Sequence, residues 1–156
     1  EWYDALDLVG VSAIDAVPEG ETYREMLAGW EGYKRRAREL HQRFNKPVVY
    51  TEVGYCSGGC EAERAPTRRD SWLHALRYQV LLEAFRNETQ WFKGVFWWHW
   101  NTDPGWFAAE ADGCMTPVWK PAEDVLREYW RTSLPKPDPW PEPAKCMGTG
   151  RCVAAR

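Results

Sequence analysis

Glu52 is the residue of this sequence whose type and position best suit it for chemistry. It follows Val48-Val49-Tyr50-Thr51, a run of apolar and β-branched residues that Pro47 opens and Gly54 closes, which is typical of a buried strand. A carboxylate at the end of such a strand costs free energy unless it is paired or used. Ligands of α/β folds bind at the carboxyl ends of strands. Glu52 is therefore a candidate catalytic residue; the alternative is a Glu just past the strand that points into solvent.

Aromatic residues form the second suggestive pattern, because the chain has eleven Trp among 156 residues and sugar rings stack on Trp faces. The run from 91 to 100 predicts a strand. Alternation puts one set of side chains on one face and the next set on the other: Phe96, Trp98 and Trp100 against Val95, Trp97 and His99. Trp98 and Trp100 lie at the carboxyl end of this strand, so we expect them near the mouth of a site, with helix-facing core as the alternative for Trp98. Tyr55 either orients Glu52 by a hydrogen bond or is a plain loop aromatic.

The elements that must position these residues alternate in type. Apolar runs predict strands over 6–13, 47–54 and 93–100. Between and after them, apolar residues in steps of 3 and 4 predict helices over 22–45, 67–87 and from Pro121 onward. Thr22 and Glu25 have the spacing of a capping box at the start of the first helix. Regular strand–helix alternation is typical of βαβ units, so the sequence predicts an α/β fold with a parallel sheet.

Length and charge exclude several classes of protein. At 156 residues the chain is too short for a complete (β/α)8 barrel of roughly 250 residues, and it begins with Glu1, so we expect a segment of a longer precursor or a partial domain. The net charge of −3 argues against a nucleic-acid surface. No apolar run approaches the length of about 18 residues that a membrane span needs, so we expect no membrane partner.

The cysteines favour disulfides over a metal site. They are Cys56, Cys60, Cys114, Cys146 and Cys152. The first two are four residues apart in a Gly-rich loop without a second ligand pair, so a loop disulfide is favoured over zinc. The last two are candidates for a second disulfide, so Cys114 is expected to be a free thiol. His41, His74 and His99 have no spaced partner. We therefore expect no metal and no cofactor, and an extracellular or secretory-pathway location.

Three motifs resemble the C-terminal part of clan A glycoside hydrolases, most closely the family 113 β-mannanase-like barrels. They are Thr-Glu-Val-Gly-Tyr at 51–55, Gly-Val-Phe-Trp-Trp-His-Trp-Asn-Thr-Asp-Pro at 94–104, and Thr-Pro-Val-Trp-Lys-Pro-Ala-Glu at 116–123. They are similar to the seventh strand, the eighth strand and the segment before the last helix of that barrel. The resemblance spans about residues 5–131 and implies a partial (β/α)8 TIM barrel of about three C-terminal βα units. From the resemblance we expect relatives to have an aromatic residue soon after the sixth strand, where this chain has Ile14 and Asp15.

The resemblance also implies a mechanism and roles for the residues. A retaining glycosidase uses two carboxyl groups, a nucleophile and an acid/base. The resemblance assigns the nucleophile to Glu52 and substrate binding to Trp98, Trp100 and Tyr55. The family's acid/base lies on the fourth strand, upstream of Glu1, so we expect the segment alone to be inactive and to need the upstream barrel strands for completion.

Two hypotheses of function follow. The first is the C-terminal segment of a retaining glycoside hydrolase that acts on a polysaccharide or oligosaccharide substrate, β-mannan or a related β-linked glycan. The second is a non-catalytic carbohydrate-binding or scaffold remnant of the same fold. We assign residues 1–132 to the barrel. Residues 133–156 form a second part, a Pro-rich linker followed by a Cys-containing tail.

Overall fold

The computed structural model describes most of the chain, with gaps. Its described residues are 2–14, 16–58, 66–98, 100, 114–132, 145–146 and 152–153. In chain order the elements are η1 (Trp2–Ala5), β1 (Val9–Ser12), α1 (Tyr23–Phe44), β2 (Val48–Val53), α2 (Arg68–Phe85), β3 (Phe92–Trp97), α3 (Pro121–Thr132), β4 (Lys145–Cys146) and β5 (Cys152–Val153).

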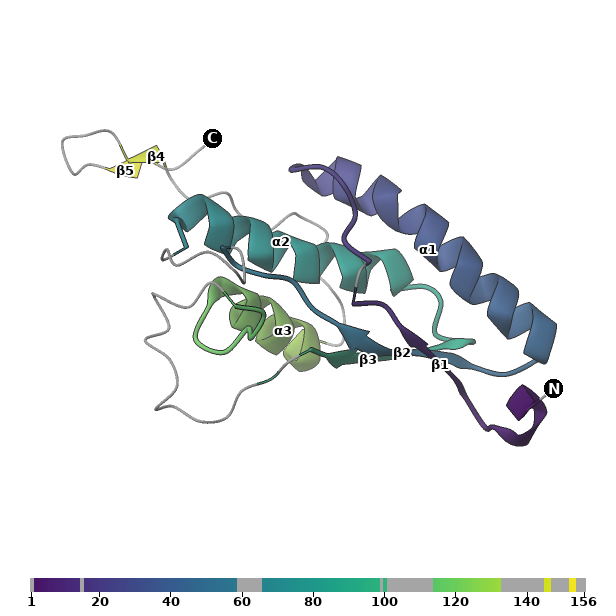
Figure 1. Ribbon diagram of the computed structural model, residues 1–156. Helices are drawn as coiled ribbons and strands as arrows, with labels where there is room; N and C mark the ends of the chain where they lie inside the picture. Colours follow the sequence, from purple (N-terminus) through teal and green to yellow (C-terminus); the bar gives the residue numbers. More distant parts are fainter. Residues whose placement is uncertain are drawn as a thin grey trace.

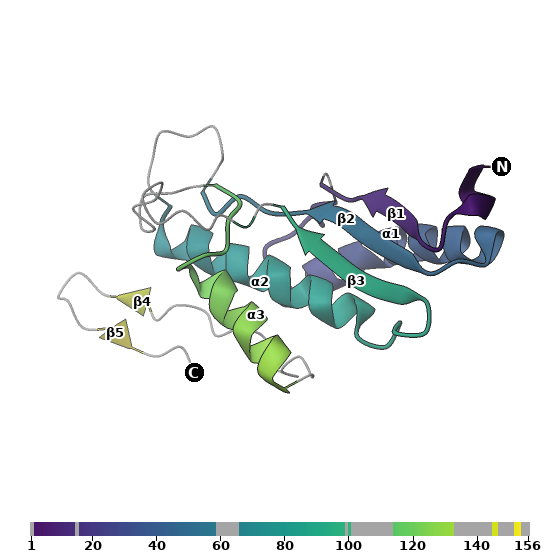
Figure 2. The ribbon, with the colours of Figure 1, turned by 90° about the horizontal axis from the view of Figure 1, so that it is seen from below.

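Strands β1, β2 and β3 form one parallel sheet in that order (Figure 1). This confirms the predicted parallel α/β fold, although each strand is shorter than the apolar run that predicted it. Helices α1 and α2 lie on one face of the sheet and pack against each other, while α3 packs along α2. Figure 2 looks onto the other face, which no described helix covers.

The helices begin and end at the residues that the capping rules favour. Thr22 and Glu25 form the predicted capping box of α1, and Asn45 ends this helix in the left-handed conformation with φ 50°. Thr67 and Asp70 form a second capping box at the start of α2. Pro121 occupies the first position of α3, where its missing N–H is not needed.

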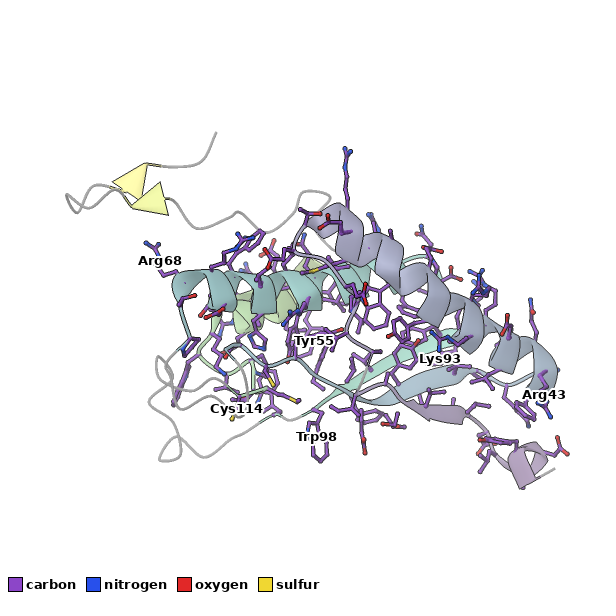
Figure 3. The ribbon with its side chains drawn as sticks, turned by 45° about the horizontal axis from the view of Figure 1, so that its top comes forward. Arg43, Tyr55, Arg68, Lys93, Trp98 and Cys114 are labelled. Atoms are coloured by element: carbon purple, nitrogen blue, oxygen red, sulfur yellow. The ribbon has the colours of Figure 1, made fainter. Side chains whose placement is uncertain are left out.

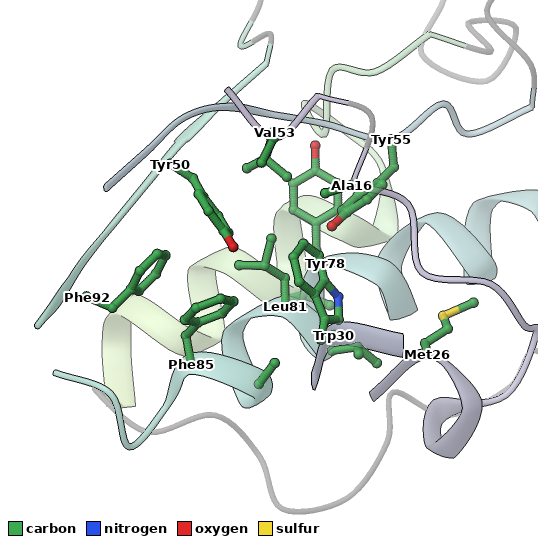
Figure 4. Close-up of a cluster of buried hydrophobic side chains, with 14 of the residues drawn as sticks. Ala16, Met26, Trp30, Tyr50, Val53, Tyr55, Tyr78, Leu81, Phe85 and Phe92 are labelled. Carbon is green, nitrogen blue, oxygen red and sulfur yellow. The ribbon is translucent and has the colours of Figure 1, made fainter. Parts of the chain in front are cut away.

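Aromatic rings dominate the core between the sheet and α1 and α2 (Figure 4). Phe85 of α2 stacks on Phe92 of β3 with ring centroids 4.0 Å apart. Tyr50 of β2 meets both rings edge-on, and Trp30 of α1 is fully buried beside Phe85. This packing fixes the distance between the sheet and its helices and therefore the position of the strand ends.

Two bulges decide which β2 and β3 side chains reach the core. Val48, Tyr50 and Val53 all face the helices and are buried, whereas strict alternation after Tyr50 would turn residue 52 to the helices. The pairing between β1 and β2 shifts register at this point, so that Thr51 and Glu52 together oppose a single step of β1. Both residues therefore leave the core. A matching shift in β3 occurs at Gly94, whose φ is +128°.

Helix α3 differs from its prediction at one residue. Val125 and Leu126 are buried against α2, as their spacing predicts, but Trp130 is 61% exposed. The spacing of apolar residues in this helix also predicts that Trp130 lies on the buried face. In the structure, its ring instead lies beside Trp100, with centroids 6.2 Å apart. It also lines a groove of about 400 Å³ along β3 and α3.

Trp119, just before α3, has a left-handed backbone with φ 59° although it carries a bulky side chain. Its N–H donates to Glu123 Oε2 at 2.6 Å, and its side chain is 59% exposed. A left-handed backbone costs an L-residue about 1–2 kcal/mol, and glycine avoids that cost at a smaller entropic penalty. In the full-length protein, we therefore expect Trp119→Gly to raise the free energy of unfolding by about 1 kcal/mol, measured by urea denaturation.

The matched control is Trp119→Ala, which removes the same ring but keeps the strained backbone. We expect alanine to be less stable than glycine at this position. Equal stability of the two variants would show that the left-handed backbone carries no cost here.

The assignment of residues 133–156 to a separate linker and tail stays a prediction, because residues 133–144 lie outside the described part. Strands β4 and β5 pair antiparallel and set Cys146 opposite Cys152. Directly paired residues of an antiparallel ladder lie within the Cα separation that a disulfide spans. Among the described residues, no helix has the length and hydropathy of a membrane span.

Candidate active site

Glu52 lies at the carboxyl end of β2, on the face of the sheet that no described helix covers. Its carboxylate accepts a hydrogen bond from the hydroxyl of Ser12 of β1, with Oγ and Oε2 3.0 Å apart. The main chains are joined at the same place, where the Ala13 N–H donates to the Glu52 carbonyl oxygen at 2.7 Å. The carboxylate is thus partly exposed and held in a fixed place, as a reactive group must be. Ser12 was not predicted as a site residue. Its polar side chain at the end of an apolar strand was the signal that could have indicated it.

Two aromatic side chains extend the same face beyond Glu52. Val53 pairs with Trp97, and Trp97 stacks on Tyr78 of α2 on the helix side, so its neighbours in β3 project from the other face. Phe96 is 66% exposed and Trp98 48%. Figure 3 shows Trp98 pointing away from the helices. The carboxyl ends of β2 and β3 thus bring an exposed Trp to the face that carries the carboxylate, although the sugar-stacking role of Trp98 remains a prediction.

Gly54 is what allows β3 to approach β2 at this end. The Trp98 N–H donates to the Val53 carbonyl oxygen at 2.7 Å. A Cβ atom on Gly54 would lie 1.8 Å from the Trp98 carbonyl oxygen and 2.9 Å from its carbonyl carbon. Real Cβ atoms essentially never come within 3.0 Å of a heavy atom outside their own residue and its two chain neighbours. Any side chain at position 54 would therefore push the Trp98 backbone away.

Tyr55 is buried in the core, whereas a residue that contacts substrate must be accessible. Its side chain is 1% exposed and packs edge-on against Tyr78, with centroids 5.6 Å apart. Burial raises the pKa of Tyr55 well above its ordinary value, so the phenol stays protonated. Its hydroxyl has no hydrogen-bond partner among the described residues and does not bond to Glu52. The geometry makes Tyr55 part of the packing behind the site.

Buried polar groups anchor the segment that precedes α3 behind Gly54. The Tyr78 hydroxyl donates to the Met115 carbonyl oxygen at 3.1 Å. Lys120, which is buried, donates from Nζ to the Cys114 carbonyl oxygen at 2.8 Å. Met115 Sδ lies 3.4 Å from the place of a Gly54 Cβ atom. Residues 114–120 therefore brace the end of β2 from the helix side.

His74 of α2 lies in the same polar cluster and is fully buried. Burial is the main cause that lowers its pKa to about 3, and the positive charges of Lys120 and Arg77 lower it further. Backbone groups of Met115 and Tyr55 act in the opposite direction, and neither ring nitrogen has a well-formed hydrogen bond among the described residues. His74 is thus a neutral core residue and is unsuited to acid–base chemistry at the site.

The other predicted site residues divide by location. Trp100 is 40% exposed and turns toward Trp130 of α3 rather than standing alone at the mouth. His99 and Cys60 lie outside the described residues. The strand face predicted for His99 and the predicted Cys56–Cys60 disulfide therefore stay predictions. Within the described ranges, no group of three or more His, Cys, Asp or Glu side chains is placed to hold a metal ion.

Known proteins that are similar to this chain include members of one glycoside hydrolase family. The profile of Glycoside Hydrolase Family 113 matches residues 1–113. The structure of GH113 β-mannanase AaManA from Alicyclobacillus acidocaldarius in complex with ManMIm is 28% identical, with a TM-score of 0.64 over 86% of this chain and 41% of that chain. A complex structure of GH113 β-1,4-mannanase gives 22% identity and a TM-score of 0.64, over 85% of this chain and 41% of that chain. Comparison with curated proteins gave no significant match.

The chain therefore spans about two fifths of the solved structures that it matches. Their likeness confirms the predicted fold, because three parallel strands alternating with helices correspond to part of their α/β barrel. The match of the family profile to most of the sequence confirms the predicted relationship as well. This chain belongs to glycoside hydrolase family 113.

Proposed function

We propose that this chain forms the part of a retaining glycoside hydrolase that carries the nucleophile, with β-mannan or a related β-linked glycan as the substrate. The observation that carries the proposal is the Glu52 carboxylate, held by Ser12 at the carboxyl end of β2 on the uncovered face of the sheet. Membership of the family supports hydrolysis of a glycosidic bond. The similar structures are a β-mannanase and a β-1,4-mannanase, which supports the choice of sugar.

In this proposal each site residue has a role that its geometry allows. Glu52 attacks the anomeric carbon and forms a covalent glycosyl–enzyme intermediate. Trp98 offers an exposed ring face for stacking on a pyranose. Trp100 is a weaker candidate for the same contact because it packs near Trp130. The acid/base belongs to an earlier strand of the barrel. Because the nucleophile and the acid/base lie on different parts of the barrel, we expect no turnover from residues 1–156 alone.

The cysteines and the location belong to the proposal too. A Cys56–Cys60 bridge would close the loop after β2, and the β4–β5 register supports a Cys146–Cys152 bridge. Disulfides form and persist outside the cytosol. We therefore propose an extracellular or secretory-pathway enzyme.

Product stereochemistry tests the proposed mechanism in the full-length protein. We expect reducing-sugar release from β-mannan to exceed release from cellulose and xylan. We expect ¹H NMR of fresh products from a β-linked manno-oligosaccharide to show the β-anomer first, because two displacements at one carbon retain its configuration. An initial α-anomer would contradict retention. Binding of mannan without any release would favour the carbohydrate-binding remnant instead.

A further inference from the structure

The Ser12–Glu52 hydrogen bond has an asymmetry that bears on the chemistry. Ser12 Oγ lies 3.0 Å from Oε2 of the carboxylate, while Oε1 has no partner among the described residues. The bulge in β2 brings these two side chains opposite each other, and the bond from the Ala13 N–H to the Glu52 carbonyl oxygen fixes the main chains at 2.7 Å. Within the described part of the chain, one carboxylate oxygen is therefore held by a side chain and the other is not.

We propose that Ser12 is the positioning residue of the nucleophile: its hydroxyl holds Oε2, so that Oε1 is the atom that attacks. The inference rests on the proposed function of Glu52.

The bond should matter most when the intermediate breaks down. In the first step, Oε1 bonds to the anomeric carbon, and the leaving oxygen departs with the bonding electron pair and takes a proton from the acid/base. Oε2 then becomes the neutral carbonyl oxygen of the ester. In the second step, water attacks the anomeric carbon, loses a proton to the acid/base and releases Glu52 as a carboxylate. A hydroxyl donor stabilises the returning negative charge more than the neutral ester, so Ser12 should accelerate this second step.

The test compares Ser12→Ala with Ser12→Thr in the full-length protein. Thr keeps the hydroxyl and suits a strand. The probe is a 2-deoxy-2-fluoro-β-mannosyl fluoride, which forms a long-lived glycosyl–enzyme detectable by mass spectrometry. After excess probe is removed, we expect the Ala variant to recover activity about 10-fold more slowly than the wild type, since a hydrogen bond to a charged group is lost. We expect the Thr variant to recover within about threefold of the wild-type rate.

Steady-state kinetics give a second readout. On an aryl β-mannoside with a good leaving group, breakdown of the intermediate limits turnover. There, Ser12→Ala should lower kcat about 10-fold and lower KM with it, so that kcat/KM changes less. A purely structural defect would lower kcat/KM and thermal stability together. The matched control is Ser71→Ala, which changes a serine of α2 that has no role in the proposed site; it should behave as wild type.

The outcomes separate the two proposals. Recovery of Ser12→Ala at the wild-type rate, with Glu52 labelled by the probe, overturns the role of Ser12 and leaves the nucleophile intact. Absence of label on Glu52 in the wild-type protein overturns the proposed function itself. Slow recovery that Thr restores supports both.

Discussion

Glu52→Gln in the full-length protein is expected to abolish turnover of β-mannan while the protein stays folded. The amide has nearly the size of the carboxylate and still offers an oxygen to the Ser12 hydroxyl, so the contacts of the fold persist. An amide cannot act as the nucleophile. We expect kcat/KM to fall on the order of 10³-fold or more, as when other enzymes lose a nucleophile, with reducing-sugar assays as the measurement and circular dichroism as the folding check.

Chemical rescue sharpens this experiment. In Glu52→Ala, azide should enter the space left by the carboxylate, attack the anomeric carbon of an aryl β-mannoside and give the α-mannosyl azide. The matched control is Glu39→Gln, which changes an exposed carboxylate on α1 and should leave activity unchanged. If Glu52→Gln keeps wild-type activity, Glu52 is not the nucleophile, and the carbohydrate-binding alternative becomes the better account.

Gly54→Ala is expected to have the second-largest effect, although it adds a single methyl group. That Cβ atom would lie 1.8 Å from the Trp98 carbonyl oxygen, which is backbone and cannot rotate away. The ends of β2 and β3 must therefore separate by more than an ångström, which displaces Trp98 relative to Glu52. Because a misplacement of about 1 Å at an active site can cost on the order of 10²-fold, we expect a loss of that size in kcat/KM.

The same substitution should also destabilise the protein, by roughly 1–3 kcal/mol for an overpacked site. Gly32→Ala serves as the control, because a Cβ atom there meets only the end of the Arg36 side chain, at 4.0 Å, in the middle of α1. It should stabilise the helix slightly. Equal activity and denaturation midpoints for the two variants would show that β2 and β3 tolerate separation at this end.

The sequence predicted the order and direction of the strands because each strand of a parallel sheet is one unbroken apolar run. It also predicted that Glu52 would stand at a strand end. It could not predict how Glu52 escapes the core. Strict alternation from Val48 and Tyr50 would turn residue 52 toward the helices, and only the pairing with β1 shows the extra residue that turns it away. The polar type of Ser12 at a strand end was a signal, but only the same pairing shows that it lies opposite Glu52.

Tyr55 and Trp130 show the converse limit. Both are amphipathic aromatics that suit a surface or a core equally well. Tyr55 is buried where it packs on Tyr78 of α2, and Trp130 is exposed where it lines the groove along β3 and lies beside Trp100. These environments are made by segments distant in sequence, so neither residue's own neighbours along the chain could decide the outcome.

The division of the sheet into a packed face and an uncovered one bears on how the family can diversify. The residues that hold the fold, such as Tyr50 and Val53, face the helices. Ser12 and Trp98, at the carboxyl end of the other face, are exposed. Within the described part of the chain, exchanging an exposed side chain on this rim removes little buried area, and most such exchanges leave the free energy of folding nearly unchanged. If the rim contacts the glycan as proposed, single substitutions there change those contacts without compensating changes among the aromatic rings behind it.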